Sequence, residues 1–277
     1  MDKVYVQVAS CSQEFRKDFE GAVDKIAEAG YDGLELFDGI YGGYSASDLK
    51  ARLARVNMSV IGAHIRMDTF DEQVAYLPES GCRYLVCPGL HVASKAEAYE
   101  AAEKLNAWGK RSNAAGLRFG YHNHNSDFDV YDDQTVIDVL IRNTDPELVF
   151  FELDVAWAWR AGVNASDFIK QYSGRFELLH VKETSRIYGP DDQFSKVFAG
   201  VKRDADGRPV FTPEQRARFD EFRKINCKLG DGIVNMPEIK KTADAQGTKA
   251  YIVEREYAYT GDVFTSLAED CSYLKAL

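Results

Sequence analysis

The sequence has no apolar run long enough to cross a membrane. A spanning helix needs about 20 consecutive apolar residues, whereas apolar stretches such as Val149–Phe151 and Val155–Trp159 are short and border on acidic residues. The first residues, Met1–Val6, also lack the charged and then apolar segment of a secretory signal. We therefore expect a soluble, cytoplasmic protein with no membrane partner.

Basic residues are outnumbered by acidic ones. The chain has 34 Lys and Arg against 44 Asp and Glu, which gives a formal net charge of −10. Nucleic-acid binding depends on clustered Lys and Arg that neutralise phosphates, and the sequence contains no dense basic run. The charge balance therefore argues against a nucleic-acid partner.

Cysteine is sparse and follows no repeated spacing. Five cysteines are an odd number, and no two of them form a Cys-x-x-Cys pair: Cys11, Cys82, Cys87, Cys227 and Cys271. This pattern argues against a disulfide framework and a zinc knuckle. We expect reduced thiols that serve as small buried side chains.

What the sequence does have is a regular alternation of short β-rich runs with stretches of helical periodicity. The first run is Val4–Ala9, and in the stretch after it apolar residues recur every three or four positions from Phe15 to Ile26. Seven more units follow in order: Gly33–Phe37 with Ser47–Val56, Ser59–Ile65 with Phe70–Leu77, Arg83–Cys87 with Lys95–Ala115, Leu117–His122 with Gln134–Arg142, Leu148–Asp154 with Ala165–Tyr172, Phe176–Val181 with Met236–Ala245, and Ala250–Glu254 with Val263–Leu274.

Eight strands that are each followed by a helix predict an α/β protein, a (β/α)8 TIM barrel, as a single domain over residues 1–277. Parallel strands need crossover connections, and 277 residues are enough for one such domain. An open doubly wound sheet is the alternative. It is less favoured because it usually has a glycine-rich phosphate turn after the first strand, and Ala9–Ser12 is not one.

One connection is far longer than the others. About fifty residues, 184–235, separate the seventh strand from its helix, where such loops normally have about two to six. Thr212 followed by Pro213 predicts a helix start inside this insertion, and Phe219, Phe222 and Ile225 form an apolar stripe. We expect a lid, a wall of the active site or a subunit contact, with a neutral insertion as the alternative.

The insertion also carries the only sequence argument for a homo-oligomer. Three of its aromatic residues could form a contact surface: Phe194, Phe198 and Phe211. On this argument alone, we expect a homo-oligomer.

Ionisable residues occur in pairs, two positions apart, at the ends of the last four predicted strands. Residues two apart share one face of a strand, and barrel enzymes place catalysis at the carboxyl ends of their strands. Ionisable groups there are costly unless they are paired or bind a metal. The four pairs are His122 with His124, Glu152 with Asp154, His180 with Lys182, and Glu254 with Glu256.

Imidazoles and carboxylates without thiolates are typical ligands of a divalent ion with open coordination positions. The sequence therefore predicts one divalent metal ion, which could be Mn²⁺, Co²⁺, Zn²⁺ or Mg²⁺. Such an ion can hold two sugar oxygens and stabilise the enediolate that forms when a proton leaves the carbon next to a carbonyl.

Five segments carry a resemblance to a known family: Phe119–His124, Phe151–Trp157, Leu178–Glu183, Lys228–Val234 and Tyr251–Glu256. They resemble segments of the xylose isomerase-like barrel superfamily, and most closely the sugar phosphate isomerase/epimerase proteins related to inosose dehydratase and inosose isomerase. The resemblance extends over nearly the whole chain and is specific for the superfamily, but not for a substrate.

The resemblance implies a metal site made by His122, Asp154, His180 and Glu254, with Glu152 as an alternative ligand to His122. In ketose epimerases the position of His122 is a glutamate, and two glutamates move the proton on opposite faces of the sugar. Glu254 matches one of them, so the resemblance implies a catalytic role for it as well. The replacement at residue 122 puts a symmetrical two-base epimerisation in doubt.

Other residues are candidates for catalysis and substrate binding. His124 is the first candidate for general base or acid, because imidazole titrates near neutral pH, and Lys182 is a candidate electrostatic clamp or acid. Four residues are candidate substrate contacts, each with a structural role as the alternative: Glu35, His64, Trp157 and Arg160. Trp157 stands where many relatives have a histidine and would offer an apolar platform for a sugar face.

The leading hypothesis is a metal-dependent isomerase or epimerase that acts on a sugar or keto-sugar through proton abstraction next to a carbonyl. The first alternative is a lyase or dehydratase, because the same enediolate can expel a β-hydroxyl or glycosidic oxygen, as from a keto-inositol or keto-glycoside. The second is a non-catalytic sugar-binding barrel. The DNA-repair endonucleases that share the fold need a basic groove, and the charge argues against that function.

Overall fold

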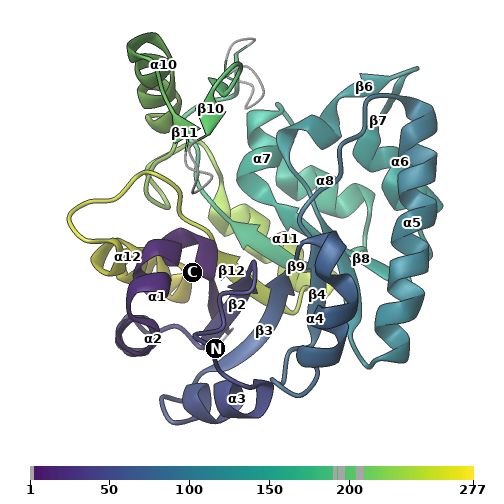
Figure 1. The fold of residues 1–277 in the computed structure, drawn as a ribbon. Helices are drawn as coiled ribbons and strands as arrows, with labels where there is room; N and C mark the ends of the chain where they lie inside the picture. Colours follow the sequence, from purple (N-terminus) through teal and green to yellow (C-terminus); the bar gives the residue numbers. More distant parts are fainter. Residues whose placement is uncertain (1–2, 190–191, 193–196, 204–208) are drawn as a thin grey trace.

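Eight parallel strands form a closed barrel, as the sequence predicted (Figure 1). The computed structural model of the chain describes residues 3–189, 192, 197–203 and 209–277. Around the barrel the strands run in the order β1, β2, β3, β4, β5, β8, β9, β12 and back to β1. Their bounds are β1 (Val4–Gln7), β2 (Gly33–Phe37), β3 (Ser59–His64), β4 (Tyr84–Cys87), β5 (Arg118–His122), β8 (Val149–Asp154), β9 (Phe176–Val181) and β12 (Ala250–Val253).

Helices follow every strand and cover the outside of the barrel. The strands are apolar on both faces because one face meets these helices and the other meets the barrel interior. The helices are α1 (Ser12–Lys17), α2 (Phe19–Glu28), α3 (Ala46–Ala54), α4 (Phe70–Tyr76), α5 (Lys95–Ala114), α6 (Val136–Asn143), α7 (Val155–Arg160), α8 (Ala165–Gln171), α10 (Pro213–Arg223), α11 (Met236–Gln246) and α12 (Val263–Ala276), with short 3₁₀ turns η1 (Val8–Cys11), η2 (Met67–Thr69) and η3 (Asn125–Phe128).

The helices begin and end where the sequence provides the signals. In α2, Val23 and Ile26 have no exposed surface and face the strands. The side chain of Asp18 accepts a hydrogen bond from the Gly21 N–H at the start of this helix. Gly30 follows its end with φ of 93°, a conformation that favours glycine.

The barrel interior has an apolar floor beneath a polar layer. The floor is a buried cluster to which most strands contribute: Tyr5, Ile61, Tyr84, Val86, Phe150, Leu178, Ala250 and Ile252. A floor of bulky side chains makes the barrel a packed core rather than a pore. Polar side chains can therefore gather only above it, towards the carboxyl ends of the strands.

The insertion after β9 has its own small core. It contains the hairpin β10 (Lys202–Arg203) and β11 (Pro209–Val210) and the helix α10, which starts after Thr212 as predicted. Phe222 and Ile225 are buried with Val197, and Phe219 packs against them. Phe198 and Phe211 lie within ring-contact distance of each other, at 6.0 Å, while Phe194 lies outside the described residues.

Two local elements outside the insertion were not predicted from the sequence. One is the helix α7, directly after β8; the other is the hairpin β6 (Val130–Tyr131) and β7 (Gln134–Thr135), which precedes α6. In Figure 1 this hairpin stands at the same end of the barrel as β10, β11 and α10. Among the described residues, no helix is long and apolar enough to span a membrane.

Candidate active site

Polar side chains from six strands meet inside the carboxyl end of the barrel, in two levels. The lower level is sealed from solvent: Glu35, Glu152 and His180 have no exposed surface, and His64 and His122 are 5% and 2% exposed. The upper level, nearer the strand ends, contains Asp154, Lys182, Glu254 and Glu256. The two levels share the imidazole of His180.

In the lower level, carboxylates alternate with imidazoles. His64 Nε2 lies 2.6 Å from Glu152 Oε2, and His122 Nδ1 lies 3.1 Å from the same oxygen. His180 Nε2 lies 2.7 Å from Glu35 Oε2. Burial, followed by the charge of Glu152, raises the pKa of Glu35 to about 7, and burial lowers the pKa of His64 to about 4. Burial in this level therefore favours the uncharged forms of Glu35 and His64.

The upper level is centred on a lysine. Lys182 Nζ lies 2.6 Å from Glu254 Oε2, 3.4 Å from Asp154 Oδ2 and 3.5 Å from Glu256 Oε2. Burial alone would lower the pKa of Lys182, but the carboxylates, led by Glu254, raise it above its ordinary value. Burial would likewise raise the pKa of Glu254, but Lys182 and His180 hold it well below its usual range.

His180 links the two levels through its two ring nitrogens. Nε2 faces Glu35 below, while Nδ1 lies 3.3 Å from Glu254 Oε2 above. Burial would lower the pKa of His180, but Glu152 and Glu35 raise it well above its usual value. The ring is therefore fixed in orientation, with Nδ1 towards the upper carboxylates.

Two groups of donors, which share His122 and His180, are close enough to hold a metal ion, with one ligand atom from each residue within 4.8 Å of the others. The upper group is the one that the sequence predicted: His122, Asp154, His180 and Glu254. The lower group consists of His64, His122, Glu152 and His180. Glu152, the alternative ligand, therefore groups with His64 rather than with Asp154 and Glu254.

Asp154 also starts the helix that shapes the site. Its Oδ1 accepts a hydrogen bond from the Trp157 N–H at 2.9 Å and so caps α7. Its backbone N–H donates to Asn123 Oδ1 at 3.0 Å. Because the last residue of β8 caps the helix, α7 begins directly at the end of the strand. The Trp157 ring therefore lies beside the upper level, with Lys182 Nζ 5.0 Å from its centroid.

Arg160 lies behind Trp157 and holds the insertion to the barrel. It is 1% exposed, and its guanidinium donates to Thr184 Oγ1 at the start of the insertion and to Asn226 Oδ1 after α10. The guanidinium also lies 4.4 Å from the Trp157 ring centroid. These contacts provide it with uncharged partners and leave it little access to a substrate.

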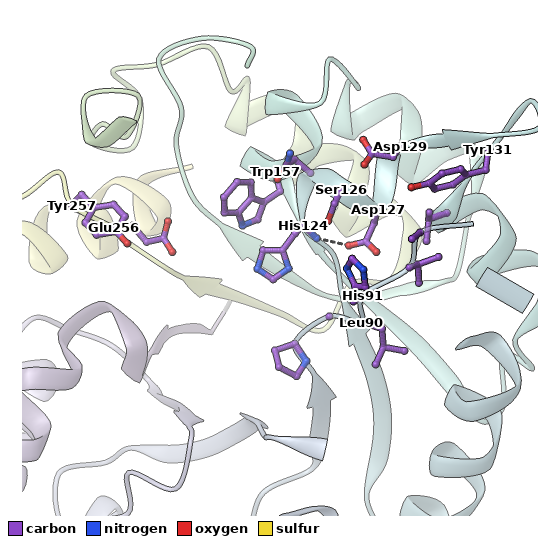
Figure 2. Close-up of a pocket in the computed structure, with 16 residues that line it drawn as sticks. Leu90, His91, His124, Ser126, Asp127, Asp129, Tyr131, Trp157, Glu256 and Tyr257 are labelled. Atoms are coloured by element: carbon purple, nitrogen blue, oxygen red, sulfur yellow. Dashed lines mark hydrogen bonds between the residues drawn. The ribbon is translucent and has the colours of Figure 1, made fainter. Parts of the chain in front are cut away.

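His124 lies at the edge of an open pocket of about 650 Å³ (Figure 2). The ring is half-buried, 5.3 Å from that of Trp157 and 5.0 Å from that of His122. Its backbone N–H donates to Asp127 Oδ2 at 2.7 Å, and burial lowers its pKa to about 4. A neutral imidazole thus lies between the donor groups and solvent. Glu35 and His64 do not line this pocket.

The backbone at Gly89 lies close to the His124 ring and limits its position. Gly89, in the segment after β4, has φ of +125°, and a Cβ built on it would lie 3.2 Å from His124 Nδ1. A side chain here would be strained by its backbone and would press on the ring.

Unpaired buried polar atoms concentrate around this site. Among the described residues, the side-chain atoms that are buried without a hydrogen-bond partner include Glu35 Oε1, Glu152 Oε1, Asp154 Oδ2, Trp157 Nε1, Arg160 Nη1 and Tyr188 Oη. Buried polar atoms are normally satisfied, so a concentration of unsatisfied ones calls for a specific explanation. Asp154 Oδ2 and the donors around it are the part that most resembles a ligand shell.

Known proteins share this barrel fold. Residues 23–277 match the family model described as xylose isomerase-like TIM barrel. The chain belongs to this family. No curated protein matches it, so the family is established without an activity.

Solved structures of the xylose isomerase-like fold resemble the chain over almost its full length. A sugar phosphate isomerase/epimerase from Parabacteroides distasonis ATCC 8503 has a TM-score of 0.77 at 22% identity, over 99% of this chain and 94% of that one. The probable 3-DHS dehydratase from Bacillus anthracis has a TM-score of 0.68 at 14% identity, over 99% of each chain. A xylose isomerase-like protein from Mycobacterium smegmatis in complex with magnesium has a TM-score of 0.61 at 15% identity, over 92% and 86%.

At these identities the resemblance establishes the fold of this xylose isomerase-like protein, and its chemistry depends on its own residues. The structure brings together the predicted residues His122, His124, Asp154, His180, Lys182 and Glu254. Sequence reasoning assigned no role to two further residues beside them, Glu256 and Asp127. Glu256 was visible as the partner of Glu254 in a strand-end pair, whereas Asp127 had no comparable signal.

Proposed function

We propose that this protein is a metal-dependent isomerase or epimerase that acts on a sugar or keto-sugar by abstracting a proton next to a carbonyl. The observation that carries the proposal is the upper donor group beside the pocket, with His124 between that group and solvent. The isomerase/epimerase and dehydratase among the structures of the same fold support a small carbohydrate as the substrate.

The upper donors fit a divalent metal ion. Two imidazoles and two carboxylates suit a transition metal or Mg²⁺, and Asp154 Oδ2 is buried without a hydrogen-bond partner. The lower donors are also suitable, but they are sealed from solvent, whereas the side chain of Glu254 is 12% exposed. We therefore favour the upper group: His122, Asp154, His180 and Glu254.

Lys182 would have to move away from Glu254 for a metal ion to bind to the upper group. Its ammonium lies 2.6 Å from Glu254 Oε2, so a cation at the same carboxylate would repel it. Glu256 Oε2, 3.5 Å from Nζ, remains as a partner on the pocket side. In that position Lys182 would point towards a bound substrate.

The chain's own residues supply the remaining functions. When bound, a divalent ion would supply a Lewis acid that polarises a carbonyl and holds two neighbouring oxygens. His124 accepts the proton from the adjacent carbon, because it is neutral and faces the pocket. Lys182 stabilises negative charge on the substrate oxygen or returns a proton, and Trp157 provides an apolar face for the sugar ring.

A lyase is the second candidate, and one observation favours it. His122 belongs to the upper donor group at the position where the resemblance implies a glutamate in ketose epimerases, so the pair of glutamates that serves a two-base epimerisation is incomplete. Elimination of a β-hydroxyl or glycosidic oxygen needs one base and one acid, for which His124 and Lys182 suffice. The dehydratase of the same fold supports this alternative.

The insertion is proposed as a wall of the same site. Phe219 and Phe222 contact Tyr257, at ring-centroid distances of 5.4 and 6.3 Å, and Tyr257 lines the pocket. Tyr188 contacts Trp157 at 5.9 Å. The insertion therefore supports two residues that border the pocket. A lid movement, a subunit contact and a homo-oligomer stay predictions.

Solvent hydrogen exchange tests the proposed function. The protein, loaded with Mn²⁺, Co²⁺, Zn²⁺ or Mg²⁺ in turn, is incubated in D₂O with keto-sugars and aldoses, and the recovered sugars are analysed by mass spectrometry. Deuterium in recovered substrate or in an isomer is expected for the isomerase, and an unsaturated or shortened product for the lyase. Sugar binding without exchange at any metal would indicate a non-catalytic barrel.

Replacing Glu35 by Gln is expected to weaken metal binding about 10- to 100-fold, the usual effect of changing the partner of a metal-binding imidazole. Glu35 Oε2 holds His180 Nε2, which leaves Nδ1 as the ligand atom. The measurement is a metal titration against a chelator. Glu183→Gln is the control, because this buried carboxylate accepts hydrogen bonds from backbone N–H groups, including those of Gly230 and Val234. Equal metal affinity in Glu35→Gln and wild type would contradict the role.

A further inference from the structure

The pocket beside His124 is larger than one sugar ring requires. It has a volume of about 650 Å³ and extends from Glu256, past His124 and Trp157, to Asp129 and Tyr131 (Figure 2). Pockets of roughly 300–1,000 Å³ bury most of a drug-sized ligand. A monosaccharide held against Trp157 would leave the end away from Glu256 unfilled.

We call this end the far groove. It lies between the segment after β4 and the hairpin that leads into α6, and its walls are mainly apolar with polar groups at the rim. The residues that form it are Leu90, His91, Val92, Asp129, Tyr131 and Val136.

Local backbone geometry builds both walls. Asp132 and Asp133 have φ of 47° and 64°, which gives the two-residue turn that closes the β6–β7 hairpin and places Tyr131 at the rim. On the other wall, the positive φ of Gly89 brings Leu90 and its neighbours against the His124 ring. The far groove is therefore continuous with the position proposed for the reacting sugar.

The far groove is unsuited to a phosphate. Among the described residues that line the pocket there is no Lys or Arg, and the acidic ones are Asp127, Asp129 and Glu256. Lys182, near Trp157, is surrounded by carboxylates. A phosphate in the groove would lose hydration beside the carboxylate of Asp129 without gaining a cation.

We propose that the substrate is a neutral glycoside, whose reacting sugar ring lies against Trp157 and whose second, uncharged ring lies in the far groove. Leu90, Val92 and Val136 would contact the apolar face of that ring, and Asp129 at the rim would accept hydrogen bonds from its hydroxyl groups. The proposal rests on the proposed function, because it takes the reacting ring to be a sugar.

Calorimetric binding with three classes of probe tests the proposal. The probes are free glucose and galactose, their 6-phosphates, and neutral glycosides of the same sugars in both anomers, as p-nitrophenyl glycosides and as disaccharides. At least one glycoside is expected to bind about tenfold or more tightly than its parent sugar and the phosphate. The aryl and disaccharide arms distinguish an aromatic second ring from a second sugar. Tighter binding of a phosphate, or no gain from any second ring, would overturn the proposal.

Two matched variants test whether the gain in glycoside affinity arises in the far groove. Val92→Trp fills the far groove and is expected to reduce glycoside affinity to that of the parent sugar, without changing the affinity for the parent sugar. Val130→Trp makes the same change on the adjacent hairpin, where Val130 is 63% exposed and does not line the pocket, and is expected to keep the gain. Loss of the affinity gain in both variants, or in neither, counts against the far groove as the binding site of the second ring.

Solvent hydrogen exchange remains a separate measurement. Exchange without a gain in glycoside affinity contradicts only the proposal of a glycoside substrate, and a gain in affinity without exchange contradicts only the proposed chemistry.

Discussion

The Asp154→Asn variant is expected to lose its metal ion and its activity while remaining folded. The substitution changes the carboxylate, whose Oδ2 has no hydrogen-bond partner, to an amide and removes one negative charge from the upper donor group. Metal affinity should fall by more than the roughly 10- to 100-fold that outer-shell substitutions cost. Elemental analysis of the purified protein, before and after chelation and reloading, measures the effect.

Asparagine is chosen because Asp154 has a second role. Its Oδ1 caps α7 by accepting the Trp157 N–H, and asparagine caps helices about as well as aspartate. Alanine would remove both functions and costs about 1 kcal/mol for the cap alone. The matched control is Asp262→Asn, the same change at the cap of α12, where Oδ1 accepts the N–H groups of Phe264 and Thr265.

The metal contents of these variants decide whether the upper donor group holds the ion. Full metal in Asp262→Asn and little in Asp154→Asn would support the upper donor group. Full metal in Asp154→Asn, with loss in His64→Ala, would instead place the ion in the lower group. Absence of metal from the wild type under every loading condition would mean that the acids and imidazoles are structural.

Replacing His124 by Ala is expected to slow turnover about 100-fold or more with the metal retained, the range for a lost general acid or base. The ring faces the pocket from the edge of the donor groups, so its removal should affect proton transfer rather than metal binding. The rate of solvent hydrogen exchange into substrate should fall in parallel with kcat.

A second variant separates chemistry from packing. His124→Gln fills more of the space beside Gly89 than alanine does but is not a base. Both variants should be equally slow, and their metal content and melting temperature should stay near those of the wild type. A rate unchanged in either variant would exclude His124 as the base, and full activity in the glutamine variant alone would assign the residue to packing.

The order of strands and helices was readable from the sequence because apolar periodicity differs between the two. All eight predicted barrel strands are confirmed to within a few residues at their ends, and so are their helices, except that the first helical stretch is divided at Asp18 into α1 and α2. The two missed elements had weaker signals. Asp154 was read as a ligand and not as the cap of α7, and Asp132–Asp133 is a poorer hairpin signal than a turn that contains glycine.

Part of the candidate site could also be predicted from the periodicity of the sequence. A period of two places His122 with His124, and His180 with Lys182, on common faces at strand ends. The partners across the barrel were not visible, since contacts such as that of Glu35 with His180 join residues 145 positions apart. Nor did the spacing predict that Lys182 lies among three carboxylates.

The sequence by itself determined the barrel, its long insertion and the residue types that gather at one end. Only the tertiary structure decided the depth of each residue and its partners. Glu152 and Asp154 share a strand face, yet Glu152 contacts His64 in the sealed level while Asp154 faces Lys182 above. The physical reason is that local periodicity fixes only the direction of a side chain, whereas its depth and neighbours depend on how the eight tilted strands are staggered around the closed barrel.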